Sequence, residues 1–425
     1  MVNVVRRIVV IGLYDSYNYD ISFHKNGVTL ITGPNGYGKT TVLNIIKNAL
    51  EQNFLYFHDL LFKKIALYFD DSEKGTRLEI EKNKVQEEMF DESEMYEVKF
   101  SFYNGNTLKA TDSFCIDKKF LRHSWSKYGR HYDEDYVFLG NGNELEKYLR
   151  RSNYELSHKF KNFQLFLNDK KCLFIKEQRI FSDNSYDANE RYTITQLAED
   201  LKNRYSKQKS LYTDESQKID SSFVKRLLAK QFKAYEEKEY LEKINALQRI
   251  VDEYQKFDLI SNYTFVGQYN ADFKPALSLY IDDMFDKIDV YQKFFRQLSL
   301  FNRFVNGKGL SNKLMILDEK NGVSFKSDSG RIIPLQKLSS GEQNLVILYY
   351  RLVFETEPNT LLLIDEPENS IHVEWLERML RDYLVMEGDL KCQMVIATHS
   401  PIFIGDNFDM AYDLYGGAYQ DWMKL

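Results

Sequence analysis

Residues 33–40 read Gly33-Pro-Asn-Gly-Tyr-Gly-Lys39-Thr40, which matches in full the pattern GxxxxGK followed by Ser or Thr. The β-branched run 28–32 before it predicts a strand, and apolar residues from Val42 to Leu50 recur at helical spacing after it. A glycine-rich turn between a strand and a helix directs backbone N–H groups and the positive end of the helix dipole at an anion. The stretch therefore predicts a phosphate-binding loop in an α/β fold.

This loop indicates ATP and Mg²⁺ as cofactors. Lys39 is placed to reach the β- and γ-phosphates, and the Thr40 hydroxyl is placed to hold Mg²⁺. A chance glycine turn is the alternative, and the flanking strand and helix argue against it. The residues expected around the nucleotide phosphates are Gly33, Asn35, Gly36, Gly38, Lys39, Thr40 and Thr41.

A second motif, LLLIDEPE at residues 361–368, begins with four apolar residues and then turns acidic. It predicts a buried strand with Asp365 at its C-terminal end, where α/β sheets bind ligands. Asp365 would hold Mg²⁺, largely through water, and Glu366 is placed to polarise the attacking water. The alternative is that the acidic pair only caps a strand. The phosphate loop elsewhere in the chain argues against this alternative.

Two shorter motifs carry polar residues at the ends of predicted elements. Residues 338–343 read LSSGEQ before an apolar helix, so Ser340 and Gly341 can present donors to an anion, although a plain helix N-cap explains the same string. His399 follows a strand expected at 393–397, which places it at the same sheet edge as Asp365. A histidine there can sense a γ-phosphate, or it can be an ordinary satisfied polar residue.

The rest of the chain predicts an α/β domain interrupted by insertions. Residues 6–12 and 172–178 read as strands, and two-residue alternation from about 64 to 136 indicates an antiparallel β subdomain. Residues 195–307 look mostly helical, and an Asn-Gly pair at 321–322 predicts a hairpin. The longest helical stripe is too short for a long coiled-coil arm; it comprises Leu241, Ile244, Leu247, Val251 and Tyr254.

Composition excludes several classes of protein. The 425 residues carry 57 Lys and Arg against 63 Asp and Glu, a net charge of −6, which excludes a wholly basic nucleic-acid coat. The cysteines Cys115, Cys172 and Cys392 are far apart, so neither a disulfide framework nor a zinc hook is expected. No apolar run approaches the ~20 residues of a membrane span. A cytoplasmic protein without membrane contact is therefore expected.

Together the four motifs, in this order and with a large insertion after the first, resemble an ABC-type ATPase head. Such heads occur in SMC-related and RecF-like DNA-repair ATPases and in the ATPase modules of OLD-family nucleases. The likeness covers about residues 1–60, 170–180 and 310–405. It implies an α/β fold, with a mixed sheet flanked by helices, an antiparallel β subdomain and a helical insertion. The expected divisions are 1–194 for lobe I, 195–307 for the insertion and 308–425 for lobe II.

The resemblance also implies roles for single residues. Ser340 and Gly341 would clamp the γ-phosphate of ATP bound to another subunit, as in a homodimer or larger homo-oligomer. Glu366 resembles the catalytic base and His399 the switch histidine, acting with Lys39. Residues 368–372 are similar to the D-loop of the family, which would place Ser370 and His372 at the subunit interface. Gln178 looks like the Q-loop glutamine that senses Mg²⁺ and the attacking water.

Two differences from related proteins exclude some of the functions that such ATPase heads serve. The chain has no transmembrane segment, so a complete transporter is excluded. Only 25 residues follow Ser400, too few for the Toprim nuclease domain of OLD-type enzymes, so another chain would have to supply nuclease activity. Residues 117–132 interleave five Lys or Arg with aromatic residues; a solvated loop is the favoured interpretation, with DNA or a partner protein as alternatives.

Three functions compete. The first is an ATP-dependent switch that controls an effector, such as a nuclease or toxin encoded in the same operon. It resembles the ATPase subunits of anti-phage systems of the PARIS, Septu or retron-associated type. The second is a RecF-like repair ATPase that binds DNA directly. The third is a nucleotide-locked scaffold with little hydrolysis, against which the set Asp365, Glu366 and His399 argues mildly.

Overall fold

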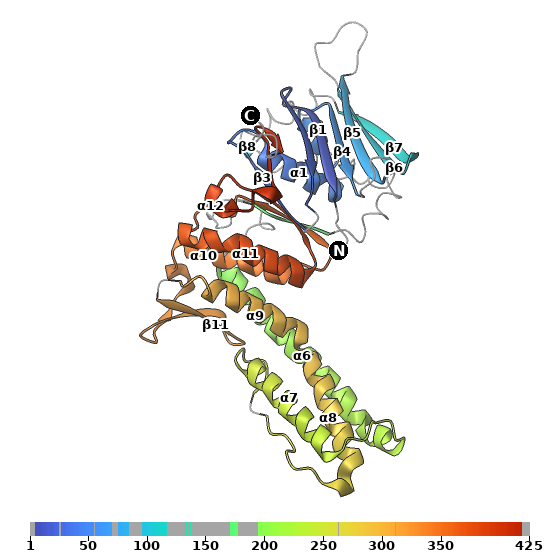
Figure 1. Ribbon diagram of the computed structural model, residues 1–425, viewed down its shortest axis with the longest axis vertical. Coiled ribbons are helices and arrows are strands. Elements are labelled where there is room, and N and C mark those ends of the chain that lie inside the picture. Colours follow the sequence, from blue (N-terminus) through green and yellow to red (C-terminus); the bar gives the residue numbers. More distant parts are fainter. Residues whose placement is uncertain are drawn as a thin grey trace. The chain divides into compact units, whose positions relative to one another are not determined.

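The computed structural model describes residues 5–24, 27–54, 56–69, 75–84, 96–116, 132–133, 136–137, 171–176, 194–261, 263–310 and 312–418. The chain forms two units, Met1–Glu177 with Thr356–Leu425 (unit 1) and Gln178–Glu355 (unit 2). Figure 1 shows their helices and strands. The boundary expected at residue 308 does not separate these units, because residues 308–355 group with the helices before them.

A six-stranded sheet positions the phosphate loop in unit 1. Its order is β10-β14-β15-β3-β16-β17, and all neighbours are parallel except the last pair. Both β14 and β15 are buried along their whole length, as parallel strands covered on both faces should be. The strands are β3 (Val28–Thr32), β10 (Lys171–Ile175), β14 (Thr360–Asp365), β15 (Gln393–Ala397), β16 (Ala411–Asp413) and β17 (Gly417–Ala418).

The predicted antiparallel sheet is also present, in the order β2-β1-β4-β5-β6-β7. The N-terminal strand expected at 6–12 belongs to this sheet, where it pairs with β2 and β4. The strands are β1 (Arg7–Leu13), β2 (Tyr17–Ser22), β4 (Lys64–Tyr68), β5 (Arg77–Lys84), β6 (Tyr96–Asn104) and β7 (Thr107–Ile116). A short pair, β8 (Tyr132–Asp133) and β9 (Tyr136–Val137), follows; the basic stretch 117–131 lies outside the described residues.

Helix α1 (Lys39–Leu50) connects the two sheets of unit 1. Its Val42, Leu43 and Ile46 share one core with Ile8 of β1 and Leu363 of β14, so apolar residues of α1 pack against both sheets. The other helices of this unit are α2 (Tyr56–Asp59), α11 (Val373–Leu390), α12 (Pro401–Ile404) and the 3₁₀ turn η4 (Phe408–Met410). Burial of α1 fixes the start of the helix, and with it the phosphate loop, at the end of β3.

Unit 2 is mostly helical and confirms the predicted helical region. Contacts join α6 to α8 and α10, α7 to α8, and α9 to α10. The helices are α6 (Ile194–Leu228), α7 (Glu237–Gln255), α8 (Lys274–Asp289), α9 (Gln292–Asn306) and α10 (Ser340–Tyr350), with 3₁₀ turns η1 (Ala271–Phe273) and η2 (Leu335–Lys337) and a π-helical segment η3 (Arg351–Glu355). None of the helices in the described ranges is long and apolar enough to cross a membrane.

The apolar stripe of α7 differs from the prediction by one residue. Ile244, Leu247, Val251 and Tyr254 are buried, but Leu241 is 37% exposed. Tyr240 is fully buried in its place, because positions 240, 244, 247, 251 and 254 follow one face of the helix more closely.

A small antiparallel sheet follows α9 and confirms the predicted hairpin. It contains β11 (Lys313–Asp318), β12 (Gly322–Ser327) and β13 (Ile332–Ile333). Gly322 has φ 66°, and a Cβ there would lie 2.2 Å from the carbonyl oxygen of Ala198 in α6. Only glycine therefore fits at this turn.

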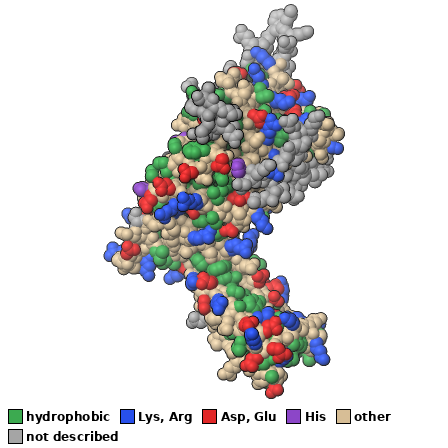
Figure 2. All heavy atoms as spheres, viewed as in Figure 1, with side chains coloured by type: hydrophobic (Ala, Val, Ile, Leu, Met, Phe, Trp, Pro, Cys, Tyr) green, Lys and Arg blue, Asp and Glu red, His purple; other side chains and the backbone are tan. Residues whose placement is uncertain are grey.

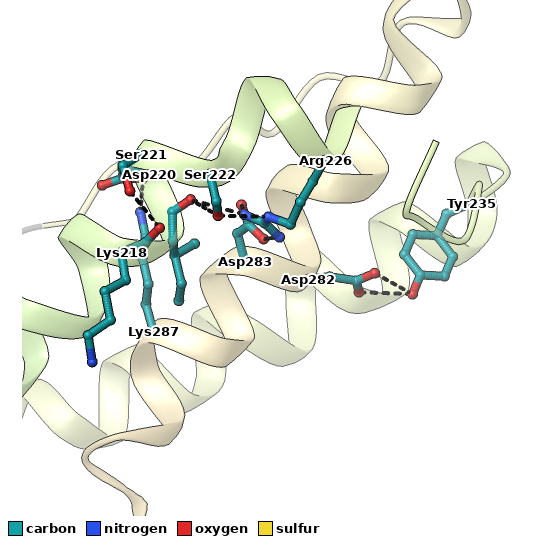
Figure 3. A network of polar contacts seen from close by, with 10 residues as sticks. Lys218, Asp220, Ser221, Ser222, Arg226, Tyr235, Asp282, Asp283 and Lys287 are labelled. Carbon is teal, nitrogen blue, oxygen red and sulfur yellow. Dashed lines mark hydrogen bonds and ion pairs between the residues drawn. The ribbon is translucent and has the colours of Figure 1, made fainter. Parts of the chain in front are cut away.

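Polar side chains join α6 to α8 (Figure 3). Arg226 donates to both carboxylate oxygens of Asp283 at 2.6 and 2.7 Å, and the Asp283 side chain is only 4% exposed. Next to this pair, the Tyr235 hydroxyl contacts both oxygens of Asp282 at 2.8 and 2.9 Å. The pair makes the packing of α6 on α8 specific, because the buried Asp283 carboxylate is costly to leave without the partly exposed Arg226.

Candidate functional site

The phosphate loop has the backbone that its sequence predicts. Gly33, Gly36 and Gly38 all have positive φ, at 144°, 86° and 82°, and α1 begins at the next residue, Lys39. A Cβ built on Gly36 would meet no atom within 4 Å. Gly36 thus faces open space, and the loop leads directly into the N-terminus of a twelve-residue helix, a position that favours phosphate groups.

Lys39 directs its ammonium group over this loop. Nζ donates to the carbonyl oxygen of Gly33 at 2.9 Å and lies 3.4 Å from that of Pro34 and 3.5 Å from Oδ1 of Asn35. The residue is only 6% exposed. Within the described ranges no carboxylate forms an ion pair with Lys39, so its positive charge is held by neutral oxygens inside the loop. Such a charge suits a polyphosphate.

Thr40 and Asp365 meet at the end of the parallel sheet, although 325 positions separate them. The Thr40 hydroxyl donates to Oδ2 of Asp365 at 2.8 Å, and Asp365, the last residue of β14, is 4% exposed. Hydroxyl and carboxylate oxygens are the hard ligands that Mg²⁺ prefers, and one or two protein ligands suffice when water and phosphate oxygens complete the shell. The donor set therefore fits Mg²⁺ bound together with a nucleotide.

Glu366 begins the turn that follows β14. It has φ 41°, which is uncommon for a residue other than glycine, and its N–H donates to the carbonyl oxygen of Ala397 at 2.9 Å. Because Asp365 and Ala397 are direct partners across β14 and β15, this bond holds the turn at the edge where both strands end. The Glu366 side chain is 18% exposed and can reach solvent water.

His399 lies at this edge too, two residues beyond β15. Its Nδ1 is 3.3 Å from Oε1 of Glu366 and 3.4 Å from Oε1 of Glu368, and the side chain is half exposed. The structure thus brings together Lys39 with Thr40 in the loop, and Asp365 and Glu366 with His399, as the sequence predicted. The chemical roles of these residues remain predictions.

Glu368 is a site residue that the motifs did not single out. Oε1 of Glu368 accepts hydrogen bonds from the Thr398 hydroxyl at 2.6 Å and from the N–H of His399 at 2.9 Å. The segment after β14 is thereby tied to the segment after β15. The sequence signals were a third acidic residue in the motif LLLIDEPE and its place at the start of the D-loop-like stretch 368–372, and neither predicted these contacts.

Two tyrosines, one in the turn between β1 and β2 and one in β2, support the loop and were also missed. The hydroxyl groups of Tyr14 and Thr41 are 3.0 Å apart, so Thr41 has a contact within the protein besides any nucleotide. Tyr19 donates to the carbonyl oxygen of Tyr37 in the loop at 2.6 Å. Burial, with neighbouring tyrosines, raises the pKa of Tyr19, so its hydroxyl stays protonated and keeps donating. No local pattern marks these residues.

The LSSGEQ motif lies in unit 2 at the start of α10. Ser339 is the N-cap and forms a capping box with Glu342, and Ser340 and Gly341 are the first helical residues. Burial opposes ionisation of Glu342, but hydrogen bonds from Lys313 and from the Ser339 N–H hold its pKa below the usual range. The motif thus forms a helix N-cap and also leaves the N-terminus of the helix exposed. The motif predicted a role for Ser340 and Gly341 but not for Ser339.

The remaining predicted residues are placed as follows. Ser370 is exposed, with φ 60°, and His372 is the N-cap of α11, where its Nδ1 accepts from the N–H of Glu374 at 3.4 Å. Their position at a subunit interface remains a prediction. Gln178 lies outside the described residues.

Comparisons with known proteins give one family and several solved structures to which the chain is similar. A family model described as "AAA domain, putative AbiEii toxin, Type IV TA system" matches residues 28–405, whereas no curated protein matches the chain. The SMC head domain with an extended coiled coil from Pyrococcus furiosus, bound to the C-terminal domain of ScpA, is 14% identical, with a TM-score of 0.38 and coverage of 94% of this chain and 90% of that chain. The SMC head domain from Thermotoga maritima is also 14% identical, with a TM-score of 0.34 and coverage of 96% and 94%.

The matched range includes the phosphate loop, the LSSGEQ motif, the acidic pair and His399. The resemblance to an ABC-type ATPase head that these motifs carried is therefore confirmed. Because the match covers most of the sequence, this chain belongs to the AAA-domain family described as putative AbiEii toxin of a Type IV TA system.

Proposed function

We propose that this protein is a Mg²⁺-dependent ATPase that works as a switch. The observation that carries the proposal is the 2.8 Å contact between Thr40 and Asp365 beside the Lys39 ammonium group. These groups come from distant parts of the chain, and together they match what a bound ATP and its metal require.

In the proposed reaction, the residues divide into binding and activating groups. Lys39 binds the β- and γ-phosphates, and backbone N–H groups at the start of α1 orient them. Mg²⁺, when bound, neutralises charge on the phosphate oxygens. Glu366 orients the attacking water and accepts its proton, and His399 contacts the γ-phosphate region from the same sheet edge.

Nucleotide binding by a single variant tests the first part. Lys39→Ala removes the positive charge over the loop, and ATP affinity measured with a fluorescent analogue should be lost. Lys109→Ala is the matched control, because Lys109 is an exposed lysine of β7 in the same unit. Unchanged affinity in the Lys39 variant would refute the assignment of the loop.

We also propose that each ATP is shared between two copies of the chain. The resemblance to ABC-type heads supports this, and so does the exposed start of α10, where Ser340 and Gly341 leave helix N–H groups available to an anion. Two identical copies would then enclose two nucleotides around a twofold axis. Ser370 and His372 would face the partner copy.

Mixing two inactive variants tests the sharing. A Gly341→Asp subunit keeps its phosphate loop, and a Lys39→Ala subunit keeps its LSSGEQ motif, so a mixed dimer has one intact composite site. Hydrolysis should reappear on mixing and stay absent in each variant alone. Mixed dimers that form but remain inactive would contradict a shared site.

We propose that the ATPase cycle controls a partner effector, such as a nuclease or toxin, in anti-phage defence. An ATPase cycle has an effect only if its two states bind something differently. On the face shown in Figure 2, acidic and basic side chains are interspersed over α7 and α8. A mixed face suits a protein partner better than DNA, which needs concentrated positive charge.

Copurification of the proteins encoded in the native operon tests whether the ATPase controls an effector. An effector retained with ATP and released in another nucleotide state supports the switch. A protein that purifies alone and binds duplex DNA in an ATP- and salt-dependent way would instead support the repair function. A partner that stays bound regardless of nucleotide, with little turnover, would support a scaffold.

A further inference from the structure

Glu368 contacts the two residues that follow β15. One carboxylate oxygen, Oε1, accepts from the Thr398 hydroxyl at 2.6 Å and from the His399 N–H at 2.9 Å, and it lies 3.4 Å from Nδ1 of the His399 ring. The same oxygen therefore contacts both the backbone and the side chain of His399. Thr398 is fully buried, so this arrangement is held on its inner side by the sheet.

The burial of Glu368 shows that this contact is unusual for a glutamate. Its side chain is 5% exposed, and Oε2 has no hydrogen-bond partner among the residues that the structure describes. Burial of a charged carboxylate is unfavourable unless hydrogen bonds or a nearby charge compensate it. A neutral amide could accept the bonds from Thr398 and His399 equally well. A carboxylate differs from an amide here chiefly in the negative charge beside Nδ1.

We propose that Glu368 is a positioning residue for His399, an inference that rests on the proposed role of His399 in ATP turnover. Two carboxylate oxygens, from Glu366 and Glu368, lie on the Nδ1 side of the ring. They keep the proton on Nδ1, and the geometry of imidazole then directs Nε2 away from both acids.

Glu368 also belongs to the segment between β14 and α11 that carries Ser370 and His372. A displacement of this segment, for example when a second copy binds, would move the carboxylate that holds His399. Glu368 thereby couples the proposed subunit interface to the histidine through one buried side chain.

Spectroscopy of the full-length protein tests the positioning without relying on hydrolysis. Two-bond ¹H–¹⁵N correlations show which ring nitrogen of His399 carries the proton, with the signal assigned from a His399→Ala variant. We expect an Nδ1–H ring in the wild type and a shift of population toward Nε2–H in Glu368→Gln. Glu377→Gln, which removes the same charge from an exposed position of α11, is the control and should leave the signal unchanged.

Turnover measured in a double-mutant cycle tests the consequence. Glu368→Gln should lower kcat about tenfold, with little change in KM, in the wild-type background. The same substitution should have less than about a twofold effect in a His399→Ala background, because Glu368 acts through His399.

Three results would overturn the proposal. The first is a His399 ring signal that is the same in Glu368→Gln as in the wild type. The second is a decrease in kcat on Glu368→Gln that is as large in the His399→Ala background as in the wild type. The third is an effect of Glu377→Gln on the ring signal as large as that of Glu368→Gln. If Glu368→Gln does not fold, Glu368→Asp keeps the charge and withdraws it from Nδ1, and a wild-type ring signal in that variant would equally refute the positioning. Absent turnover in the wild type would refute the proposed function, while the ring signals would still decide the role of Glu368.

Discussion

Replacement of Thr40 by valine removes one hydroxyl group and keeps the shape of the side chain. That hydroxyl donates to a carboxylate oxygen of Asp365 at 2.8 Å, and Asp365 is 4% exposed. A hydrogen bond to a charged acceptor contributes about 1.5–3 kcal/mol. The short distance and the buried acceptor justify a value of about 2 kcal/mol. For a unit of the size of unit 1, this loss corresponds to a decrease in Tm of roughly 5 °C.

The same hydroxyl is the expected Mg²⁺ ligand, so Thr40→Val should also weaken ATP binding in a metal-dependent way. A loss of about 2 kcal/mol corresponds to roughly thirtyfold in Kd. We expect this change in a titration with a fluorescent ATP analogue and excess Mg²⁺, and a change of less than about threefold when EDTA replaces the metal, since Lys39 and the loop are intact. Thr40→Ser, which keeps the hydroxyl, should bind as the wild type does.

Two results would refute this reasoning. A Thr40→Val protein with wild-type Tm would mean that the contact with Asp365 contributes nothing to stability. An equal loss of affinity with Mg²⁺ and with EDTA would mean that the substitution damages the phosphate loop and not a metal ligand.

Three further predictions concern other residues. Glu366→Gln should keep ATP affinity and lower turnover by orders of magnitude, trapping the ATP state; unchanged turnover would mean that another group is the base. Burial raises the pKa of Glu387 above its usual 4.5. The protein is therefore not destabilised by this group below about pH 4.5, where the carboxyl is protonated in both the folded and the unfolded states. As the pH rises through the folded-state pKa, ionisation of the buried carboxyl lowers the free energy of unfolding. Glu387→Gln should therefore raise Tm at about pH 8 and change it little at about pH 4, and the opposite order would contradict the assignment. Arg226→Met should destabilise unit 2 by about 3 kcal/mol because it leaves Asp283 charged and buried, and Asp283→Leu added to it should restore most of the loss. Hydrogen exchange of α6 and α8 measures both variants; equal protection in the single variant would refute the role of the pair.

The parts of the fold that the sequence could predict depend on local signals. The strand before Gly33, the helix after Lys39 and the buried strand that ends at Asp365 each have a clear period or apolar run, and each forms as expected. The turn at Gly322 was likewise readable, because its conformation requires glycine. Parallel pairing then aligns the strand ends, so the sequence alone places Asp365 and His399 at one edge of the sheet.

The parts that could not be predicted depend on contacts between distant residues. The bond from Thr398 to Glu368 exists only because β14 and β15 pair in a register that sets Asp365 opposite Ala397. Nothing near Tyr14 in the sequence indicates that its hydroxyl reaches Thr41, since Tyr14 lies in the turn after β1 and Thr41 lies in α1. The short β-branched run at 6–12 marked the N-terminal strand but did not identify its partners.

The two points at which the chain passes between the units lie at opposite ends of neighbouring strands. β10 and β14 are parallel, with Lys171 opposite Thr360 and Ile175 opposite Ile364, and the chain leaves after β10 and returns before β14. A direct connection between these points would have to run back along five residues of strand, about 17 Å. Excision of residues 178–355 with a two-residue splice would leave eight residues between the strands, namely 176–177, the splice and 356–359. That is fewer than the roughly dozen residues that a connection between parallel neighbours takes, so the splice would strain the pairing next to Asp365. A linker of about eight residues, or two separately expressed pieces, 1–177 and 356–425, would leave the pairing free of tension.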